Sequence, residues 1–350
     1  YDVNPGNTLN TNFGEYVNGK LVFPMSAPTS DQEPWVTDGT VEGTFPLFEG
    51  TNKPGNFSET FVHDGTMYFT AWTSARGTEL YKTDGTVEGS SLVKDIYWGE
   101  TASSPKDFVV LNDEVYFSAR SENLRQVWKT DGTEEGTIEI SDIDGDAVWL
   151  GGLTVIGDQI FFKSPSTTYG QELWVTDGTS EGTSLFADIN PDGDGEVDYL
   201  HEFNGDLYFS ANDGDNGEEL WRMDGVTQEL TSFDLMPGGN DSSPLSFFTF
   251  GDQLFFVADD GEGNEPWITD GTLEGTTMLA DISPTSNSVN TNFMYILNQE
   301  LLFIGITESS DKQIWKTNGT PEGTAPLTNI RSQNYQRIRD LTVFDNLLFF

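Results

Sequence analysis

One unit of about 47 residues is repeated along the chain, and this repeat limits the possible folds more than any other feature. Each copy contains one aromatic residue at a fixed place, and the intervals are 46, 47, 46, 47, 46 and 48 residues. These aromatic residues are Trp35, Tyr81, Trp128, Trp174, Trp221, Trp267 and Trp315. A period of this length is typical of solenoids, propellers and other repeat arrays.

Turn signals inside the unit predict four short strands. Pairs such as Asn18-Gly19, Asp64-Gly65 and Asn204-Gly205 separate two apolar runs and suit two-residue hairpin turns, which need positive φ. The fixed aromatic residue lies in a third run, and a Thr-Asp-Gly-Thr turn leads from most copies to a fourth. No segment between them has a helical period. We therefore expect an all-β fold, a β-propeller of four-stranded antiparallel blades.

An acidic or amide residue ends each fourth run, 13 or 14 residues after the aromatic residue. These residues are Glu49, Asp95, Asp142, Asp188, Asp234, Asp281 and Asn329. Eight hairpin turns but only seven aromatic halves are present. Residues 1–350 are therefore expected to form a single propeller of eight blades with an incomplete closing blade, and seven blades is the alternative. Residues 1–6 look like the tail of a preceding copy, which indicates a larger polypeptide.

The phrase Glu172-Leu173-Trp174-Val175-Thr176-Asp177-Gly178-Thr179 closely resembles the ELWxxDGT repeat family, and residues 79–86 are nearly as close. The resemblance covers essentially the whole chain. Proteins of this family are bacterial, secreted or displayed on the cell surface, and their repeats are taken to form propellers. The resemblance implies an exported bacterial protein with an extracellular or cell-surface role. It implies no reaction, because the family carries no established catalytic residues.

The charge of the chain excludes several classes of partner. Lys and Arg total 16 against 58 Asp and Glu, which gives a formal net charge of −42. Nucleic acids and anionic membranes need a basic surface, so neither is expected as a partner. No apolar run approaches the length needed to cross a bilayer. A cation, a basic partner or high solubility fits this charge, and the absence of cysteine excludes disulfides and thiolate sites.

The repeated turns and aromatic residues favour structural roles. Asp and Thr side chains in a turn bond to its own backbone amides, and a glycine takes positive φ. The turns recur in nearly every copy regardless of their neighbours, so we interpret them as scaffold rather than as a set of ligand sites. The fixed aromatic residues are interpreted as core between blades rather than as a platform for sugars.

One acidic loop predicts a calcium site. Asp188, Asn190 and Asp192 match the first three ligand positions of an EF-hand-like loop, and Asp194 and Asp198 add two carboxylates. The loop then departs from the EF-hand-like pattern, because its twelfth position is Tyr199. A solvated acidic loop is the alternative. Weaker versions of the pattern are Asp142, Asp144 and Asp146, and Asp213, Asp215 and Glu218.

Catalysis finds little support in the residues. His63 and His201 are the only histidines, and the arginines Arg331, Arg337 and Arg339 lie in one stretch. Even spacing leaves no insertion that could carry a site specific to one blade. We therefore expect no enzyme, but a non-catalytic binding, adhesion or assembly propeller with a protein or glycan partner. The alternatives are a calcium-dependent lectin-like propeller and a hydrolase or lyase acting on polysaccharides.

Overall fold

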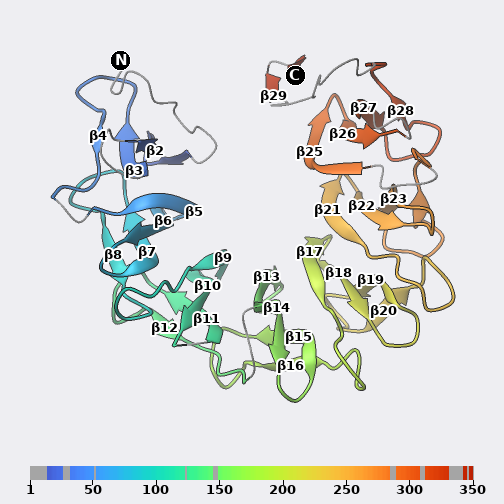
Figure 1. Ribbon diagram of the computed structural model, residues 1–350, viewed down its shortest axis with the longest axis horizontal. Coiled ribbons are helices and arrows are strands. Elements are labelled where there is room, and N and C mark those ends of the chain that lie inside the picture. The colour runs from blue at the N-terminus through green and yellow to red at the C-terminus, as the bar shows by residue number, and fades with distance from the viewer. Residues whose placement is uncertain are drawn as a thin grey trace. The chain divides into compact units, whose positions relative to one another are not determined.

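The computed structural model describes residues 14–26, 32–50, 53–122, 124–144, 149–283, 289–307, 312–330, 342–344 and 347–349. Two compact units divide the chain, Tyr1–Phe186 and Ala187–Phe350, and each is described by itself. Four complete sheets lie in the first unit, the last of them reaching its boundary, and three lie in the second (Figure 1). The prediction of one domain over residues 1–350 stays a prediction.

Each complete sheet has four antiparallel strands in chain order. The first strands are β1 (Glu15–Val17), β5 (Gly55–His63), β9 (Lys106–Leu111), β13 (Gly151–Ile156), β17 (Asp198–Phe203), β21 (Leu245–Phe250) and β25 (Val289–Leu297). The second strands are β2 (Lys20–Ser26), β6 (Thr66–Thr73), β10 (Glu114–Ser121), β14 (Gln159–Ser166), β18 (Asp206–Asn212), β22 (Gln253–Asp259) and β26 (Glu300–Ile306). The third strands are β3 (Gln32–Thr37), β7 (Gly77–Thr83), β11 (Leu124–Thr130), β15 (Gly170–Thr176), β19 (Glu218–Met223), β23 (Asn264–Thr269) and β27 (Lys312–Thr317). The fourth strands are β4 (Phe45–Pro46), β8 (Ser91–Lys94), β12 (Ile138–Glu139), β16 (Ser184–Ala187), β20 (Leu230–Phe233), β24 (Thr277–Met278) and β28 (Ala325–Pro326).

The predicted all-β propeller of four-stranded antiparallel blades is confirmed, and the favoured number of blades is corrected. Among the described residues seven sheets are complete, so the alternative of seven blades fits. The eighth hairpin forms a sheet of two strands, β29 (Thr342–Phe344) and β30 (Leu347–Phe349). The eighth hairpin was taken as part of an incomplete eighth blade, but a hairpin supplies only two of the four strands that a blade needs. The proposed tail of a preceding copy at residues 1–6 lies outside the described residues.

Hairpin turns between the first and second strands follow the predicted chemistry. Asn18 has a φ of 49° and Gly19 a φ of 79°, and the turn at Asn204 and Gly205 repeats this pattern with 53° and 87°. Positive φ at both central residues makes a turn whose twist matches that of the flanking strands. The turns therefore set the register of each hairpin.

The core lies between successive sheets within each unit. One apolar cluster joins Leu80 and Val93 of the β5–β8 sheet to Val115, Phe117 and Trp128 of the β9–β12 sheet. Equivalent clusters join other pairs of complete sheets that are neighbours within a unit, two more pairs in the first unit and two in the second. Five of the seven fixed aromatic residues, Tyr81, Trp128, Trp174, Trp267 and Trp315, belong to these clusters, which supports their interpretation as core between blades.

Candidate functional site

The Thr-Asp-Gly-Thr turns satisfy their own polar groups. In the turn between β11 and β12, the backbone N–H and hydroxyl of Thr133 donate to Oδ1 of Asp131 at 2.8 and 2.7 Å. The Thr133 hydroxyl accepts the N–H of Gly136 at 2.9 Å, and the hydroxyls of Thr130 and Thr137 lie 2.7 Å apart. The Thr133 hydroxyl is also the main reason why the pKa of Asp131 is below its usual value. These bonds leave the turn a scaffold, as its sequence predicted.

Two observations show how far the turn depends on shape rather than charge. A Cβ on Gly136 would lie 2.1 Å from Oδ1 of Asp131, so this position requires glycine. In the last copy Asn318 replaces the aspartate, and its Oδ1 still accepts the N–H and hydroxyl of Thr320 at 3.1 and 2.8 Å. An oxygen acceptor is therefore sufficient, and no bound cation is needed to explain the motif.

The residue two places before the fixed aromatic residue binds the connection between one sheet and the next. Glu79 is fully buried, and its Oε2 accepts the N–H of Ile96 at 2.9 Å and the hydroxyl of Ser103 at 2.5 Å. Its Oε1 accepts the N–H of Ser103 at 3.0 Å. Burial raises the pKa of Glu79 to about 7, although these hydrogen bonds oppose the shift. We call this position the connection-binding residue.

In the β9–β12 sheet the connection-binding residue is neutral. Gln126 is 2% exposed, and its Nε2 donates to the carbonyl of Ile143 at 2.9 Å. Its Oε1 accepts the N–H of Ile143 at 3.2 Å and the hydroxyl of Ser141 at 2.5 Å. The amide therefore holds the connection with one donor and one acceptor, where Glu79 only accepts. Gln313 repeats this arrangement with Ile330 in the second unit.

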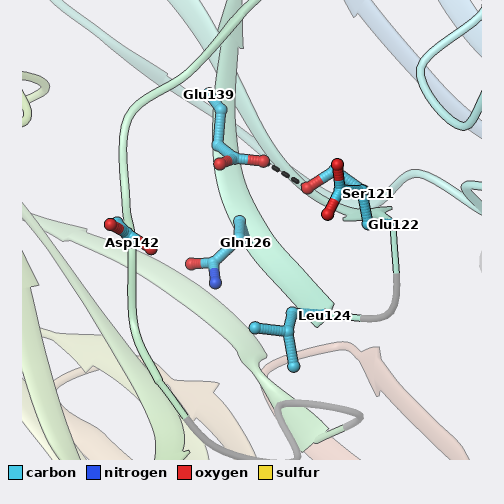
Figure 2. A pocket seen from close by; sticks show the side chains of 6 residues that line it. All are labelled: Ser121, Glu122, Leu124, Gln126, Glu139 and Asp142. Carbon is cyan, nitrogen blue, oxygen red and sulfur yellow. Dashed lines mark hydrogen bonds between the residues drawn. The ribbon is translucent and has the colours of Figure 1, made fainter.

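Beside Gln126 lies a hollow of about 560 Å³ at the edge of the β9–β12 sheet (Figure 2). The residues that line it are Ser121, Glu122, Leu124, Gln126, Glu139 and Asp142. Figure 2 shows Gln126 between Asp142 on one side and Ser121 with Glu139 on the other. The Ser121 hydroxyl donates to the Glu139 carboxylate. The strands β10, β11 and β12, the loop between β10 and β11 and the connection after β12 thus supply the walls.

Carboxylates dominate the electrostatics of this hollow. Partial burial raises the pKa of Glu139, and the neighbouring charges of Asp142 and Glu122 raise it further. The hydrogen bond from Ser121 opposes this effect. A group whose pKa is raised by like charges has a higher affinity for a proton or another cation. The arrangement can therefore accept positive charge and disfavours anions.

A second hollow of about 410 Å³ adjoins the first and shares Glu139 and Asp142 with it. Trp174 and Thr183 of the β13–β16 sheet line its far side. The indole N–H of Trp174 already donates to the carbonyl of Ser164 at 3.1 Å. The Trp174 ring therefore offers apolar surface, and the polar character of the pair of hollows comes from the carboxylates.

The predicted calcium residues lie along one loop between β16 and β17, all within the described part of the chain. Asp188, Asn190, Asp192 and Asp194 belong to the loop itself, and Asp198 is the first residue of β17. Asn190 Nδ2 donates to the carbonyl of Asp194 at 3.0 Å, and Oδ1 of Asp198 accepts the N–H of Tyr199 at 2.7 Å. Among the described residues, no group of three or more His, Cys, Asp or Glu is arranged to hold a metal ion. Calcium binding here stays a prediction.

The two weaker calcium candidates have different surroundings. Asp142 lines the hollow of Figure 2, Asp144 accepts the hydroxyl of Thr167, and Asp146 lies outside the described residues. Asp213 accepts the N–H of Asp215 at 3.0 Å within a turn, and Glu218 accepts the hydroxyl of Ser210 at 2.8 Å. These bonds give Asp213 and Glu218 ordinary structural partners.

Both histidines bond to the sheet that follows their own. Nε2 of His63 lies 3.0 Å from Oδ1 of Asp113, and Nε2 of His201 lies 3.1 Å from the hydroxyl of Thr249. Burial lowers the pKa of His201, so it favours the neutral form. These positions are consistent with packing between sheets. The predicted arginine group at Arg331, Arg337 and Arg339 lies outside the described residues.

Sequence reasoning missed the hollow and the connection-binding residue. Glu122 and Glu139 do not occupy fixed places of the repeat, so no pattern pointed to them. The connection-binding residue did leave a signal, because Glu or Gln precedes the fixed aromatic residue by two places in every copy. These residues are Glu33, Glu79, Gln126, Glu172, Glu219, Glu265 and Gln313.

No family model matches the chain, and no curated protein matches it. The resemblance to the ELWxxDGT repeat family therefore stays a prediction, and so does export. No helix among the described residues is long and apolar enough to cross a membrane.

Solved structures resemble the chain in fold. A solved structure from a study of two prolyl endopeptidases matches with a TM-score of 0.53 and 13% sequence identity. The match covers 90% of this chain and 49% of that chain. A puromycin-hydrolyzing peptidase of Mycobacterium tuberculosis gives 0.52 at 12% identity, with coverage of 91% and 53%. A puromycin hydrolase gives 0.50 at 14% identity, with coverage of 96% and 57%. The chain thus spans about half the length of these proteins.

These neighbours correct the predicted function. The sequence led us to expect a non-catalytic binding, adhesion or assembly propeller, with a calcium-dependent lectin-like propeller or a polysaccharide-active enzyme as alternatives. Three solved structures that share the fold are instead a puromycin-hydrolyzing peptidase, a puromycin hydrolase and a prolyl endopeptidase. The prediction failed because regular spacing was taken to exclude enzymes, whereas a regular propeller can form part of a larger enzyme.

Proposed function

We propose that the chain is the propeller domain of a larger hydrolase of the peptidase class. One observation carries this proposal: the likeness extends over nine-tenths of this chain but only about half of each peptidase. A chain related in this way corresponds to one part of such an enzyme. The remaining half of the enzyme would supply the bond-breaking groups.

The described residues are consistent with this division of labour. The polar groups of the repeated turns are bonded within the turns, and the two histidines bond to neighbouring sheets. The hollow beside Gln126 supplies a concave acidic wall instead. In the proposed enzyme the propeller contributes contacts that select substrates, and charge is the property by which it selects.

An assay of the native polypeptide tests the proposal. The polypeptide that carries this chain is purified from its source with an antibody against residues 53–122 and incubated with a panel of peptide arylamides. We expect turnover by the native polypeptide and none by residues 1–350 alone. Inhibitors specific for serine, cysteine and metal-dependent peptidases then assign the chemistry. A folded native polypeptide that cleaves no member of the panel would overturn the proposal.

A further inference from the structure

The nine tryptophans of the chain fall into two groups. Six occupy the fixed aromatic position in third strands: Trp35, Trp128, Trp174, Trp221, Trp267 and Trp315. The other three, Trp72, Trp98 and Trp149, all lie in the first unit and are 39%, 88% and 67% exposed. A large apolar ring in water has no role in the core. Exposed tryptophan is instead common at the centre of protein interfaces.

Trp98 and Trp149 lie on the two connections that enter and leave the β9–β12 sheet. Trp98 belongs to the connection from β8 to β9, and Trp149 to the connection from β12 to β13. The hairpin β10–β11 binds the first connection through Nη2 of Arg125, which donates to the carbonyl of Ser104 at 3.0 Å. It binds the second through Gln126 and Ile143. The loop of this hairpin therefore lies between the two connections that carry the tryptophans.

Exposed carboxylates accompany the two rings. Glu100 lies two residues after Trp98, Glu122 is on the hairpin loop, and Asp142 and Asp144 precede Trp149. No ion pair within the described residues involves these four side chains. We call Trp98, Glu100, Glu122, Asp142 and Trp149 the acidic-aromatic edge. Two of these residues, Glu122 and Asp142, also line the hollow of Figure 2.

Nearby cations do not cancel this charge. Arg76 pairs with Asp95 at 3.3 Å. Arg125 is 6% exposed, and its guanidinium donates to the carbonyl and hydroxyl of Ser118 and to Ser104. Arg120 and Arg125 are cross-strand partners, so their side chains lie on the same face of the hairpin. Ser121 and Leu124 are the next pair and lie on the opposite face. The face beside the hollow is left to carboxylates.

We infer that the acidic-aromatic edge is a docking surface for a basic polypeptide segment. Charge complementarity identifies the occupant, because exposed carboxylates in a chain of net charge −42 attract lysine and arginine side chains. The tryptophan faces add attraction for the same cations, since an ammonium or guanidinium group binds over an indole ring. The hollow accepts one such side chain beside Glu139. This inference does not depend on the proposed hydrolase.

Binding of designed peptides to residues 1–350 tests the inference. The ligand is a twelve-residue peptide of alternating Arg and Ser, and the controls are peptides with Glu or Gln in place of Arg. We expect measurable affinity for the arginine peptide alone in titration calorimetry, with a change in tryptophan fluorescence. The double variant Trp98→Ala, Trp149→Ala should weaken binding at least tenfold, and Glu122→Gln about threefold with a smaller dependence on salt.

Val226→Ala is the matched control, because Val226 is 93% exposed but lies in the other unit. It should leave the affinity unchanged. Melting curves check that every variant folds, as expected for exposed positions. Equal affinity of the wild type and the double tryptophan variant would overturn the inference, since binding would then reflect net charge alone. Tryptophan-dependent binding of a neutral oligosaccharide without binding of the arginine peptide would also overturn it.

Discussion

Two neighbouring sheets of the first unit bind their connections with side chains of nearly identical shape but different chemistry. Glu79 of the β5–β8 sheet accepts three hydrogen bonds, whereas Gln126 of the β9–β12 sheet accepts two and donates one. The glutamate can be ionised, and its surroundings raise its pKa to about 7. The glutamine cannot. The same fold is therefore maintained by a group that responds to pH in one sheet and by a group that does not in the next.

This difference shows what the repeat requires. Each sheet needs an acceptor for one N–H of the connection that follows it, that of Ile96 in one case and that of Ile143 in the other. It does not need a charge. The glutamate version adds a desolvation penalty, because burial disfavours the ionised form. The fold therefore does not depend on an acidic residue at this position.

Truncation of either residue should produce the largest effect. Glu79→Ala leaves the buried N–H groups of Ile96 and Ser103 without the carboxylate, and Gln126→Ala does the same to Ile143. We expect each variant to lose about 4 kcal/mol of the free energy of unfolding, measured in urea at pH 5. Val62→Ala on the surface of β5 is the control, with a change below about 0.5 kcal/mol. A loss confined to one of the two variants would show that the positions are not equivalent.

Replacement of the glutamate by glutamine should remove a pH dependence. The pKa of Glu79 is raised from 4.5 to about 7, so the folded state holds this proton more tightly than the unfolded chain. Its contribution to stability is complete below pH 4.5 and is lost as the pH rises through 7. The whole difference corresponds to about 3 kcal/mol. Glu79→Gln should therefore flatten the decline of stability between pH 4.5 and 8, in melts recorded across that range.

Glu88→Gln, at an exposed position in the same sheet, serves as the control for this pH series. It removes one negative charge without touching the connection, so the slope of stability against pH should match that of the wild type. If Glu79→Gln also keeps that slope, Glu79 is not the group that titrates.

The reverse exchange should introduce a pH dependence where none exists. Gln126→Glu replaces the donor to the carbonyl of Ile143 with a second acceptor and adds a carboxylate beside Glu139 and Asp142. Repulsion should raise the pKa of the new group and lower stability by about 2 kcal/mol at pH 8, with a smaller loss at pH 4.5. Denaturant titrations at the two pH values measure this difference. Equal losses at both would contradict the role assigned to ionisation.

The smallest effects are expected from the hydroxyls. Ser103→Ala removes one hydrogen bond to Glu79, and Ser141→Ala removes one to Gln126, each at a cost of about 1 kcal/mol. Only Ser103→Ala should also raise the pKa of the connection-binding residue, because this bond stabilises the carboxylate. Proton uptake between pH 5 and 8 should therefore change in Ser103→Ala and not in Ser141→Ala. A change in both would mean that another group titrates.

Much of the fold could be predicted from the sequence because each copy of the repeat contains turn sequences that are recognisable by themselves. Asn-Gly pairs and the turn at Asp131 act locally, through backbone angles and bonds between residues a few places apart. The interpretation of the Thr-Asp-Gly-Thr motif as scaffold followed from the same local chemistry. The number of blades did not follow from this local chemistry. A sheet is complete only when its third and fourth strands are present, and a count of hairpins does not include those strands.

The candidate site could not be predicted in the same way. Glu122, Glu139 and Asp142 come from a hairpin loop, a fourth strand and a connection, and only the folded sheet brings them to one hollow. The search for alternating oxygen ligands favoured residues 188–198 instead, because that loop resembles a known local pattern. Long-range proximity in a chain with 58 acidic residues leaves no local signal.

The closed hydrogen bonding of the turn at Asp131 has a consequence for the history of the gene. A segment that carries its own donors and acceptors can be duplicated in tandem without the simultaneous appearance of new partners elsewhere. The requirement for glycine at Gly136 is carried within the same few codons, so each new copy inherits it intact. Copies can then diverge at their connections and loops while their turns stay alike. The tryptophans and carboxylates of the acidic-aromatic edge lie in such diverged segments, on a scaffold that duplication alone could extend.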